Sequence, residues 1–446
     1  MRILFIIFVS LISSSPALSE LIEPPEEQLN AFTQALGIEK TSSLSIKEAV
    51  YFVLSQHPSV KNALGFEERA KEIINISKSR YYPQISGGIS SSYDRYRTGR
   101  YQNKYLQDME LNVEQMLYDF GKTSNSVKKS EYGSFKTKAR TQLIVERLIE
   151  EVSRTVIEIV RYQNLTRLAQ KLAQEITGLT ILVEKRHAKG ASTLSDVLQA
   201  RSRKDSAKTL IIESRAQHKQ WLQQLALLTN VQMLVYASLK DFPVELEKSC
   251  QFKDIKWDLV PEVVMADMAA EEASVDMELA KAQEWPTLLL QAGISRPINA
   301  TPIHGSRFDN HIQLSFTMPL YQGGGLSANK RAAAGALRAA MAETMEVRLE
   351  IRQRLAELVS QHKSLQESSQ LLRERVKNIE GTKELYKKQY LDLGTRTMVD
   401  LLNAEQEYHQ ARVDVMNYVF DMKVLQVECA FMQGLLAHGF DVAALY

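Results

Sequence analysis

The side chains that could do chemistry in this 446-residue chain do not form a catalytic set. Its eight histidines are scattered, and none belongs to an H-E-x-x-H motif or lies at metal-ligand spacing from a carboxylate. The glycine run at 323–325 is followed by Leu326 and Ser327, without the lysine of a phosphate-binding loop. The 55 basic and 53 acidic residues are interspersed along the chain. We therefore expect no enzymatic activity, no cofactor, no metal site and no nucleic-acid partner.

Polar residues with a recurring spacing follow two glycines that are far apart in the chain. Gly190 precedes Asp196 by six residues, and Gly394 precedes Asp400 by six residues. A glycine adopts the left-handed conformation that ends many helices, and a carboxylate is favoured near the start of a helix. Each segment therefore predicts a turn between two helices. For Asp196 we favour a role in starting the second helix.

The N-terminal residues have the pattern of a cleaved export signal, which we assign to residues 1–19. A basic start at Arg2 is followed by an apolar run over residues 3–12 and by small residues that end at Ser19. Because the apolar run is too short for a spanning helix, we expect cleavage to leave Glu20 as the mature N-terminus. The cleavage point has no cysteine, so a lipoprotein anchor is not supported.

The two cysteines, Cys250 and Cys429, are too few for a disulfide framework or a cysteine-rich metal site. An exported protein meets an oxidising compartment, where one bridge between them is possible. Two unpaired, partly buried thiols are the slightly favoured alternative.

Four landmarks recur in the same order in the two halves of the chain. The spacing is 203 residues for the first three and 204 for the fourth. The matched positions are 57–60 with 260–263, Pro83 with Pro286, 117–121 with 320–324, and 190–196 with 394–400. So long a period indicates a duplicated substructure and not a solenoid repeat. We predict a first repeat over 20–228, a linker or equatorial segment over 229–260 and a second repeat over 261–446.

Each half contains two segments with the chemistry of β-strands. We predict strands at about 84–96, 108–118, 287–296 and 310–320. In the clearest of them, polar residues alternate with the apolar residues Ile312, Leu314, Phe316 and Met318. Alternation over about ten residues is typical of membrane-barrel strands. A soluble hairpin that is half-buried on a core is the alternative.

These strands are too few to close a barrel in one chain, because the smallest closed barrels have about eight. An open sheet in lipid would leave the backbone groups of its edges unpaired, which is prohibitive. A membrane barrel must therefore be shared, and three chains of four strands would supply twelve. The predicted transitions from barrel to helices are Pro83, Gly121, Pro286 and Gly324.

Long proline-free stretches follow each strand pair and predict helical hairpins. They cover residues 122–228, turning at Gly190, and residues 325–436, turning at Gly394. A helix of about 65 residues spans about 100 Å. Apolar residues recur there in steps of three and four, which indicates coiled-coil packing. A further helix is predicted over about 45–79.

Taken together, these features resemble the TolC family of outer-membrane efflux and secretion channels, over essentially the whole mature chain. The resemblance rests on H-P-S-V at 57–60, Pro83, L-Y-D-F-G at 117–121, L-Y-Q-G at 320–323 and the two glycine turns. It implies a mainly α fold with a transmembrane β part: a homotrimer with a twelve-stranded barrel in the outer membrane and a twelve-helix periplasmic tunnel. It also implies three kinds of partner: outer-membrane lipid, a periplasmic adaptor protein, and an inner-membrane ABC or proton-driven transporter.

In this family a polar network closes the tunnel near the second turn, and the resemblance assigns that role to Tyr390, Arg396 and Asp400. Asn403 stands where the family pattern has a second aspartate, so a trimer has three fewer negative charges in that ring. Because of this difference, we do not expect divalent or trivalent cations to bind there strongly enough to block the tunnel entrance. For Asp400, starting a helix is an equally favoured role. The resemblance also implies adaptor contact at four turn residues, Gly190, Asp196, Gly394 and Thr395.

The segment from Asp400 to Glu407 has a D-L-L-x-x-E-x-E pattern similar to that of channels for type I protein secretion. The missing lipidation cysteine points the same way. A channel for drug or metal efflux is the first alternative, and a coiled-coil scaffold that forms no channel is the second.

Overall fold

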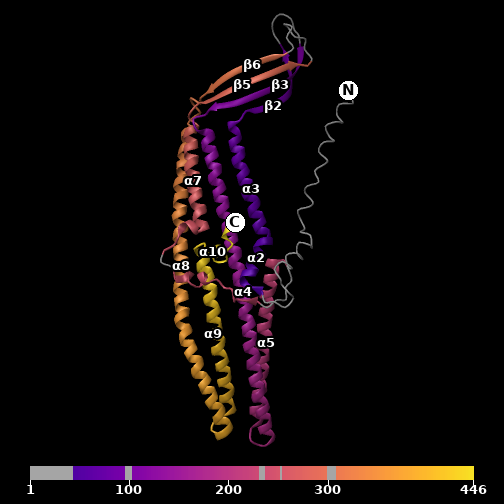
Figure 1. Cartoon of the computed structure of the whole chain (residues 1–446), viewed down its shortest axis with the longest axis vertical. Coiled ribbons are helices and arrows are strands. Elements are labelled where there is room, and N and C mark those ends of the chain that lie inside the picture. Colours follow the sequence, from indigo (N-terminus) through magenta and orange to yellow (C-terminus); the bar gives the residue numbers. More distant parts are fainter. Residues whose placement is uncertain (1–43, 96–102, 231–236, 252–253, 299–307, 446) are drawn as a thin grey trace, which may run out of the picture.

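The structure is a computed structural model that describes residues 44–95, 103–230, 237–251, 254–298 and 308–445. A four-stranded sheet lies at one end of an elongated body, and the turns of two helical hairpins lie at the other (Figure 1). Short elements fill the middle of the body. The predicted export signal, residues 1–19, lies outside the described residues.

Two helices lead from the described N-terminal end to the sheet. α2 (Ile46–Gln56) and α3 (Pro58–Lys78) are separated at His57, whose backbone is extended, with φ −63° and ψ 130°. The prediction of one helix over 45–79 is therefore wrong. The residue before a proline is pushed out of the helical region, and a proline fits the first turn of a new helix.

The sheet has the strand order β2-β3-β5-β6, and all neighbours are antiparallel. Its strands are β2 (Gln84–Arg95), β3 (Asn103–Tyr118), β5 (Thr287–Pro297) and β6 (Asp309–Thr317). β3 begins at Asn103, before the predicted residue 108. β6 ends before the predicted residue 320, and Pro319 lacks the N–H that would continue the ladder. β2 and β6 are the two edges of this sheet.

One face of the sheet is apolar across all four strands. Directly opposed pairs such as Leu290 and Leu314 place every second side chain of each strand on that face. Its exposed apolar side chains are Ile85, Ile89, Met109, Leu111, Leu290, Ile294, Ile312, Leu314 and Phe316. The opposite face is polar, and there the Gln291 amide donates to Glu114 over 2.8 Å.

Long helices follow each strand pair. In chain order the helical elements are α4 (Lys122–Ala188), α5 (Leu194–Thr229), α7 (Pro261–Ala282), α8 (Gly325–Lys388), the π-helical turn η4 (Gln389–Leu393) and α9 (Met398–Met432). α4 begins after Gly121 at φ 94°, and α8 begins after Gly324 at φ 83°. Glycine suits both positions because a side chain would be strained at such angles. None of the helices in the described part of the chain combines the length and the apolar character that a membrane crossing requires.

The helices form one layer, but the helices that make up this layer near the sheet differ from those that make it up near the turns. Near the sheet they lie side by side in the order α3, α4, α7 and α8 (Figure 1). Toward the turns the order is α5, α4, α9 and α8. The two longest helices, α4 and α8, therefore run through both parts, and the strand pairs and turns sit at their ends.

The largest apolar core lies midway along the body, where α2 and the C-terminal elements pack on α4. The short elements of the chain are η1 (Ser79–Tyr81), the parallel pair β1 (Leu44–Ser45) and β4 (Ala237–Ser238), α6 (Val244–Glu247), η2 (Ser249–Gln251), η3 (Trp257–Leu259), α10 (Leu436–Gly439) and η5 (Ala443–Leu445). The helix expected to run to residue 436 ends at Met432. Gly434 breaks it at φ 66°, and a Cβ there would lie 1.9 Å from the carbonyl oxygen of Leu259.

Two buried contacts fasten short elements to the long helices. A disulfide between Cys250 and Cys429 joins η2 to α9. The favoured expectation of free thiols is therefore wrong, because packing brings the two Cα atoms to 5.4 Å, within disulfide range. On α4, Glu146 is 3% exposed and accepts from the backbone N–H groups of Leu436 (3.1 Å) and Ala437 (2.9 Å). Burial raises the pKa of Glu146 to about 7.

Candidate functional site at the hairpin turns

The turns between α4 and α5 and between η4 and α9 lie together at the end of the body farthest from the sheet (Figure 1). An apolar cluster joins the two hairpins beside these turns. Its buried members are Leu172, Ile176, Val183, Val197, Ala200, Ala207, Tyr390, Met398, Leu401 and Leu402. Because they come from α4, α5, η4 and α9, the two hairpins of one chain share a small core there.

The first turn stops one helix and starts the next. Gly190 has φ 76°, and its N–H donates to the carbonyl of His187 over 2.9 Å. Thr193 is the N-cap of α5, and Asp196 accepts from its hydroxyl (2.8 Å) and its N–H (3.0 Å). The hydroxyl bond, followed by the N–H bond, lowers the pKa of Asp196. Asp196 thus has the geometry of a helix start.

The second turn repeats this arrangement. Gly394 has φ 63°, and the N–H of Thr395 donates to the carbonyl of Gln389 over 3.2 Å. Thr397 is the N-cap of α9, and Asp400 accepts from its N–H (3.2 Å) and its hydroxyl (3.0 Å). These bonds, that from the N–H first, lower the pKa of Asp400. Asp400 therefore starts a helix as Asp196 does.

Arg396 makes its contacts within its own hairpin. Its Nε donates to Gln389 Oε1 over 3.2 Å, and its guanidinium lies 4.3 Å from the centre of the Tyr386 ring. Its Nη1 is 3.9 Å from Asp400 Oδ2 in a solvent-exposed ion pair, which is a weak link. Within the described residues of one chain, Arg396 therefore braces the second turn.

Tyr390 joins the two hairpins through Arg186, a residue that sequence analysis did not single out. Tyr390 lies in the π-helical turn and is 6% exposed. The Arg186 guanidinium of α4 lies 4.7 Å from the centre of its ring and donates to its carbonyl oxygen over 3.4 Å. Burial raises the pKa of the Tyr390 hydroxyl. Arg186 and Tyr390 are 204 residues apart, so they occupy equivalent positions in the two repeats, but that equivalence does not indicate a contact between them.

A second link between the hairpins runs from Arg203 of α5 to α9. Its Nη2 donates to Asn403 Oδ1 over 3.1 Å, and its Nη1 donates to Gln406 Oε1. Both acceptors are neutral amides, so this link lacks the charge that an aspartate at position 403 would supply. Sequence analysis named Asn403 but did not identify Arg203 or Gln406 as part of this link. No local pattern connects residues that are two hundred positions apart.

A more buried polar network lies between α8 and α9. Lys383 Nζ is 3.3 Å from Glu405 Oε2, and the two side chains are 14% and 8% exposed. The same ammonium lies 4.5 Å from the centre of the Tyr408 ring, and the Tyr408 hydroxyl donates to Glu380 over 2.8 Å. Burial raises the pKa of Glu405, and the charge of Lys383 opposes that shift. These contacts fasten the two helices of the second hairpin to each other.

The four predicted transition residues lie at the other end, between the sheet and the helices. Pro286 is buried directly before β5, whereas Pro83 is exposed between η1 and β2. Gly121 and Gly324 precede α4 and α8, and the N–H of Gly121 donates to the Asp119 carboxylate over 3.1 Å. They shape the junctions and are far from the turns.

The two hairpins are held together at this site by noncovalent contacts that can open reversibly. These contacts are hydrogen bonds, cation–π contacts and ion pairs, and each can break and re-form without covalent change. A groove of 510 Å³ between α8 and α9 opens beside them, and its lining includes Tyr386, Asp400, Asn403 and Glu407. Within the described residues, no group of three or more His, Cys, Asp and Glu side chains could hold a metal ion.

Comparison with known proteins identifies the family. Residues 49–231 and 260–424 match the family described as outer membrane efflux protein. The chain belongs to this family. This chain is 22% identical over 427 residues to outer membrane protein TolC of Escherichia coli K12, covering 90% of this chain and 85% of TolC. It is also 22% identical over 365 residues to outer membrane efflux protein BepC of Brucella suis biovar 1, covering 79% and 77%.

Solved structures share the fold of this chain at lower identity. Outer membrane protein VceC of Vibrio cholerae matches with a TM-score of 0.76 at 17% identity, covering 87% of this chain and 96% of VceC. The outer-membrane channel OprN matches with a TM-score of 0.77 at 18% identity, covering 87% and 89%. The family predicted from the sequence is therefore confirmed, together with a mainly helical channel fold and an outer-membrane location. Family and fold are those of channels and not of enzymes.

Proposed function

We propose that three copies of this outer membrane efflux protein form an export duct. Their sheets would close a twelve-stranded barrel in the outer membrane, and their helices would form a twelve-helix tunnel through the periplasm. The duct would receive cargo from an inner-membrane transporter by way of a periplasmic adaptor protein. We favour protein cargo exported by type I secretion.

The amphipathic sheet carries this proposal. Its apolar face suits hydrocarbon and its polar face suits a water-filled lumen. The edges β2 and β6 need partners if the sheet lies in lipid, where unpaired backbone groups are very costly. Pairing β6 of one copy with β2 of the next satisfies every edge once the ring is closed. Three sheets of four strands make twelve, above the minimum of about eight.

The organisation of the chain supports the same proposal. We assign residues 1–19 to the export signal, 20–228 and 261–446 to two repeats, and 229–260 to the equatorial segment between them. Each repeat contributes one strand pair and one helical hairpin to the duct: β2 and β3 with α4 and α5, and β5 and β6 with α8 and α9.

The hairpin turns would form the gate of the tunnel. The contacts of Arg186 with Tyr390 and of Arg203 with Asn403 hold the second hairpin against the first. Outward movement of the second hairpin would break both contacts. The Lys383–Glu405 network, and Arg396 with Asp400, would move with that hairpin. We assign gating to Tyr390, Arg396, Asp400 and Asn403, as the resemblance implied, and add Arg186 and Arg203.

The exposed turns would meet the adaptor protein. We assign this contact to the four turn residues Gly190, Asp196, Gly394 and Thr395. The D-L-L-x-x-E-x-E pattern that begins at Asp400 supports type I secretion. Export of drugs or metals is the second candidate function. It is favoured because the words "efflux protein" occur both in the description of the matching family and in the name of BepC.

The proposal is tested on the full chain by membrane fractionation, migration on unheated gels and conductance in planar bilayers. We expect an outer-membrane trimer that dissociates on heating and has a small resting conductance. A soluble or monomeric product without conductance would refute the duct. Deletion of the gene followed by assays of secreted protein and of drug and metal tolerance separates the two classes of cargo.

A further inference from the structure

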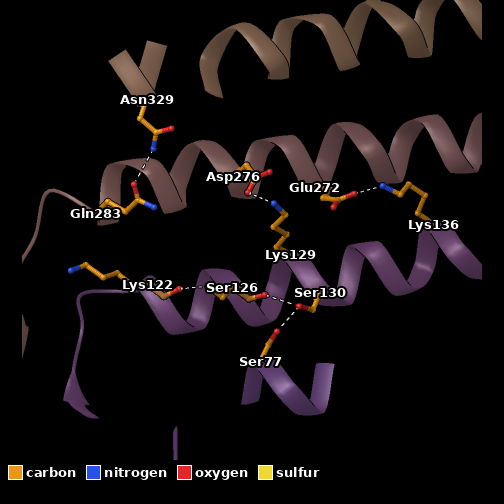
Figure 2. Close-up of polar contacts among 10 residues, drawn as sticks. All are labelled: Ser77, Lys122, Ser126, Lys129, Ser130, Lys136, Glu272, Asp276, Gln283 and Asn329. Carbon is orange, nitrogen blue, oxygen red and sulfur yellow. Dashed lines mark hydrogen bonds and ion pairs between the residues drawn. The ribbon is translucent and has the colours of Figure 1, made fainter. Parts of the chain in front are cut away.

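In the helix layer beside the sheet, ion pairs between side chains join α4 to α7. Figure 2 shows α7 beside α4, with α8 on one side of this pair and α3 on the other. Three ion pairs link α4 to α7: Lys129–Asp276 (2.7 Å), Lys136–Glu272 and Arg147–Glu262 (2.9 Å). On α8, Asn329 donates to Gln283, the residue directly after α7, over 2.9 Å. Polar contacts therefore supplement the apolar residues that α7 buries, which include Val263, Ala266 and Val275.

The two ends of this layer coincide with the two edges of the sheet. α3 leads into the edge strand β2, and α8 follows the edge strand β6. α3 packs on α4 and α8 packs on α7, so each has a side that faces away from the layer. When β6 of one copy pairs with β2 of the next, α8 of the first copy comes to lie beside α3 of the second.

The residues that would meet there follow from a constant spacing. α3 and α7 begin at Pro58 and Pro261, and α4 and α8 begin after Gly121 and Gly324, in each case 203 residues apart. The observed contact between α4 and α7 is thus a template for a contact between α8 and α3. The replacements are Lys129 by Ala332, Lys136 by Ala339, Asp276 by Ile73 and Glu272 by Arg69.

The side of α3 that corresponds to the α4-facing side of α7 is apolar. It presents Phe66, Ile73 and Ile76, which are 44%, 39% and 67% exposed in the single chain. Large apolar side chains on one exposed side of a helix indicate a surface that another element covers. On α7 the positions equivalent to Phe66 and Ile73 are Ala269 and Asp276, whereas the position equivalent to Ile76 is Leu279. The large apolar side chains at the first two positions are therefore particular to α3.

The corresponding side of α8 carries small side chains. Ala332, Ala336 and Ala339 are all exposed, and their spacing of four and three residues places them along one side of the helix. Small side chains let a neighbouring helix approach closely. Arg69 lies on the apolar side of α3, and Glu343 continues the alanine side of α8 by one turn. In the described part of the chain neither takes part in an ion pair, so opposite charges remain available to set the register.

We infer that copies of this chain join through an apolar seam, in which Phe66, Ile73 and Ile76 of α3 pack on Ala332, Ala336 and Ala339 of the neighbouring copy. The inference rests on the proposed trimer and specifies its contact surface. Helices α4 and α7 belong to one chain and need little further attraction. Separate copies must associate from solution or membrane, and burial of apolar surface drives that step.

The decisive experiment converts the seam into a copy of the ionic contact. Ile73→Asp alone should lower the temperature at which the full-length trimer dissociates on gels. Ile73→Asp combined with Ala332→Lys should restore most of the loss, because the pair rebuilds Lys129–Asp276 between copies. Ile73→Asp combined with Ala342→Lys is the matched control and should not restore it. Ala342 lies ten residues further along α8, about 15 Å away.

A cross-linking experiment tests the seam even if these variants assemble poorly. Ile73→Cys together with Ala332→Cys, oxidised in membranes, should give covalent dimers and trimers on heated, non-reducing gels. Ile73→Cys with Ala342→Cys should give far fewer. A stable trimer that shows neither this cross-link nor charge rescue overturns the seam and leaves the duct standing. Absence of any trimer in the unaltered protein overturns the duct itself.

Discussion

The middle of the body and the hairpin turns are built from the same long helices but are held together differently. In the middle, a large apolar core is reinforced by the disulfide between Cys250 and Cys429 and by buried Glu146. At the turns, a small apolar cluster is supplemented by hydrogen bonds and cation–π contacts, many of them exposed. Local stability follows the density of buried contacts, and movable segments come from its low end. The comparison teaches that movement belongs at the turns and rigidity in the middle.

The largest effect should come from cavities in the two apolar clusters. Ile149→Ala in the middle should lower the free energy of unfolding by about 2–5 kcal/mol, because Ile149 is fully buried and a cavity would remain. Ile176→Ala at the turns should fall at the lower end of that range, because the smaller cluster can close over the space. Denaturant unfolding in detergent measures both. An equal or larger loss of unfolding free energy for Ile176→Ala would contradict the expectation that the middle of the body is the more stable region.

Removal of the disulfide should have the next largest effect. Replacement of both Cys250 and Cys429 by serine should cost about 2–4 kcal/mol, because the bridge closes a long loop. The melting temperature of the variant should match that of the unaltered protein under reduction. The conductance at rest should be unchanged, since the bridge lies far from the turns. No difference between oxidised and reduced protein would contradict the bridge.

The pH dependence of stability should report on Glu146. Its pKa of about 7 in the folded protein lies above the ordinary 4.5, so the folded state binds the proton more tightly. The resulting stabilisation is fully present below pH 4.5 and is lost as the pH rises through 7, by up to about 3 kcal/mol. Glu146→Gln should flatten this dependence in unfolding measured from pH 4.5 to 8. The control Glu151→Gln, on the same helix, should keep it.

The contacts at the turns should affect conductance more than stability. Arg186→Ala removes the cation–π contact between the hairpins, which contributes about 0.5–1 kcal/mol. It should raise the resting conductance in planar bilayers. Arg396→Ser should raise it less, because the contacts of Arg396 within the described residues are with its own hairpin. A larger rise for Arg396→Ser would indicate that this arginine acts between copies of the chain.

The smallest effect should come from a single added charge. Asn403→Asp converts the hydrogen bond from Arg203 into an ion pair and should strengthen this link by about 0.2–1 kcal/mol. The resting conductance should fall, and the fall should diminish at high salt because exposed charges are screened. Arg203→Gln in the same background should abolish the gain. An unchanged conductance would remove the Arg203–Asn403 contact from the gate.

Sequence alone determined what depends on local pattern. Alternation of Ile312, Leu314 and Phe316 has a period of two, and the same residues form β6 on the apolar face of the sheet. The glycine turns, the capping aspartates and the repeated spacing led to the family, which is confirmed. The break at His57 is equally local, because a proline disfavours helical backbone at the residue before it.

Only the tertiary structure decided which distant residues meet. The bridge between Cys250 and Cys429, the stacking of Arg186 on Tyr390 and the pairing of β3 with β5 join positions more than a hundred residues apart. Such contacts depend on how helices and strands pack against one another, and no spacing within either segment encodes that. Arg396 shows the same limit: its motif is plain in the sequence, but its partners depend on which way the turn directs its side chain.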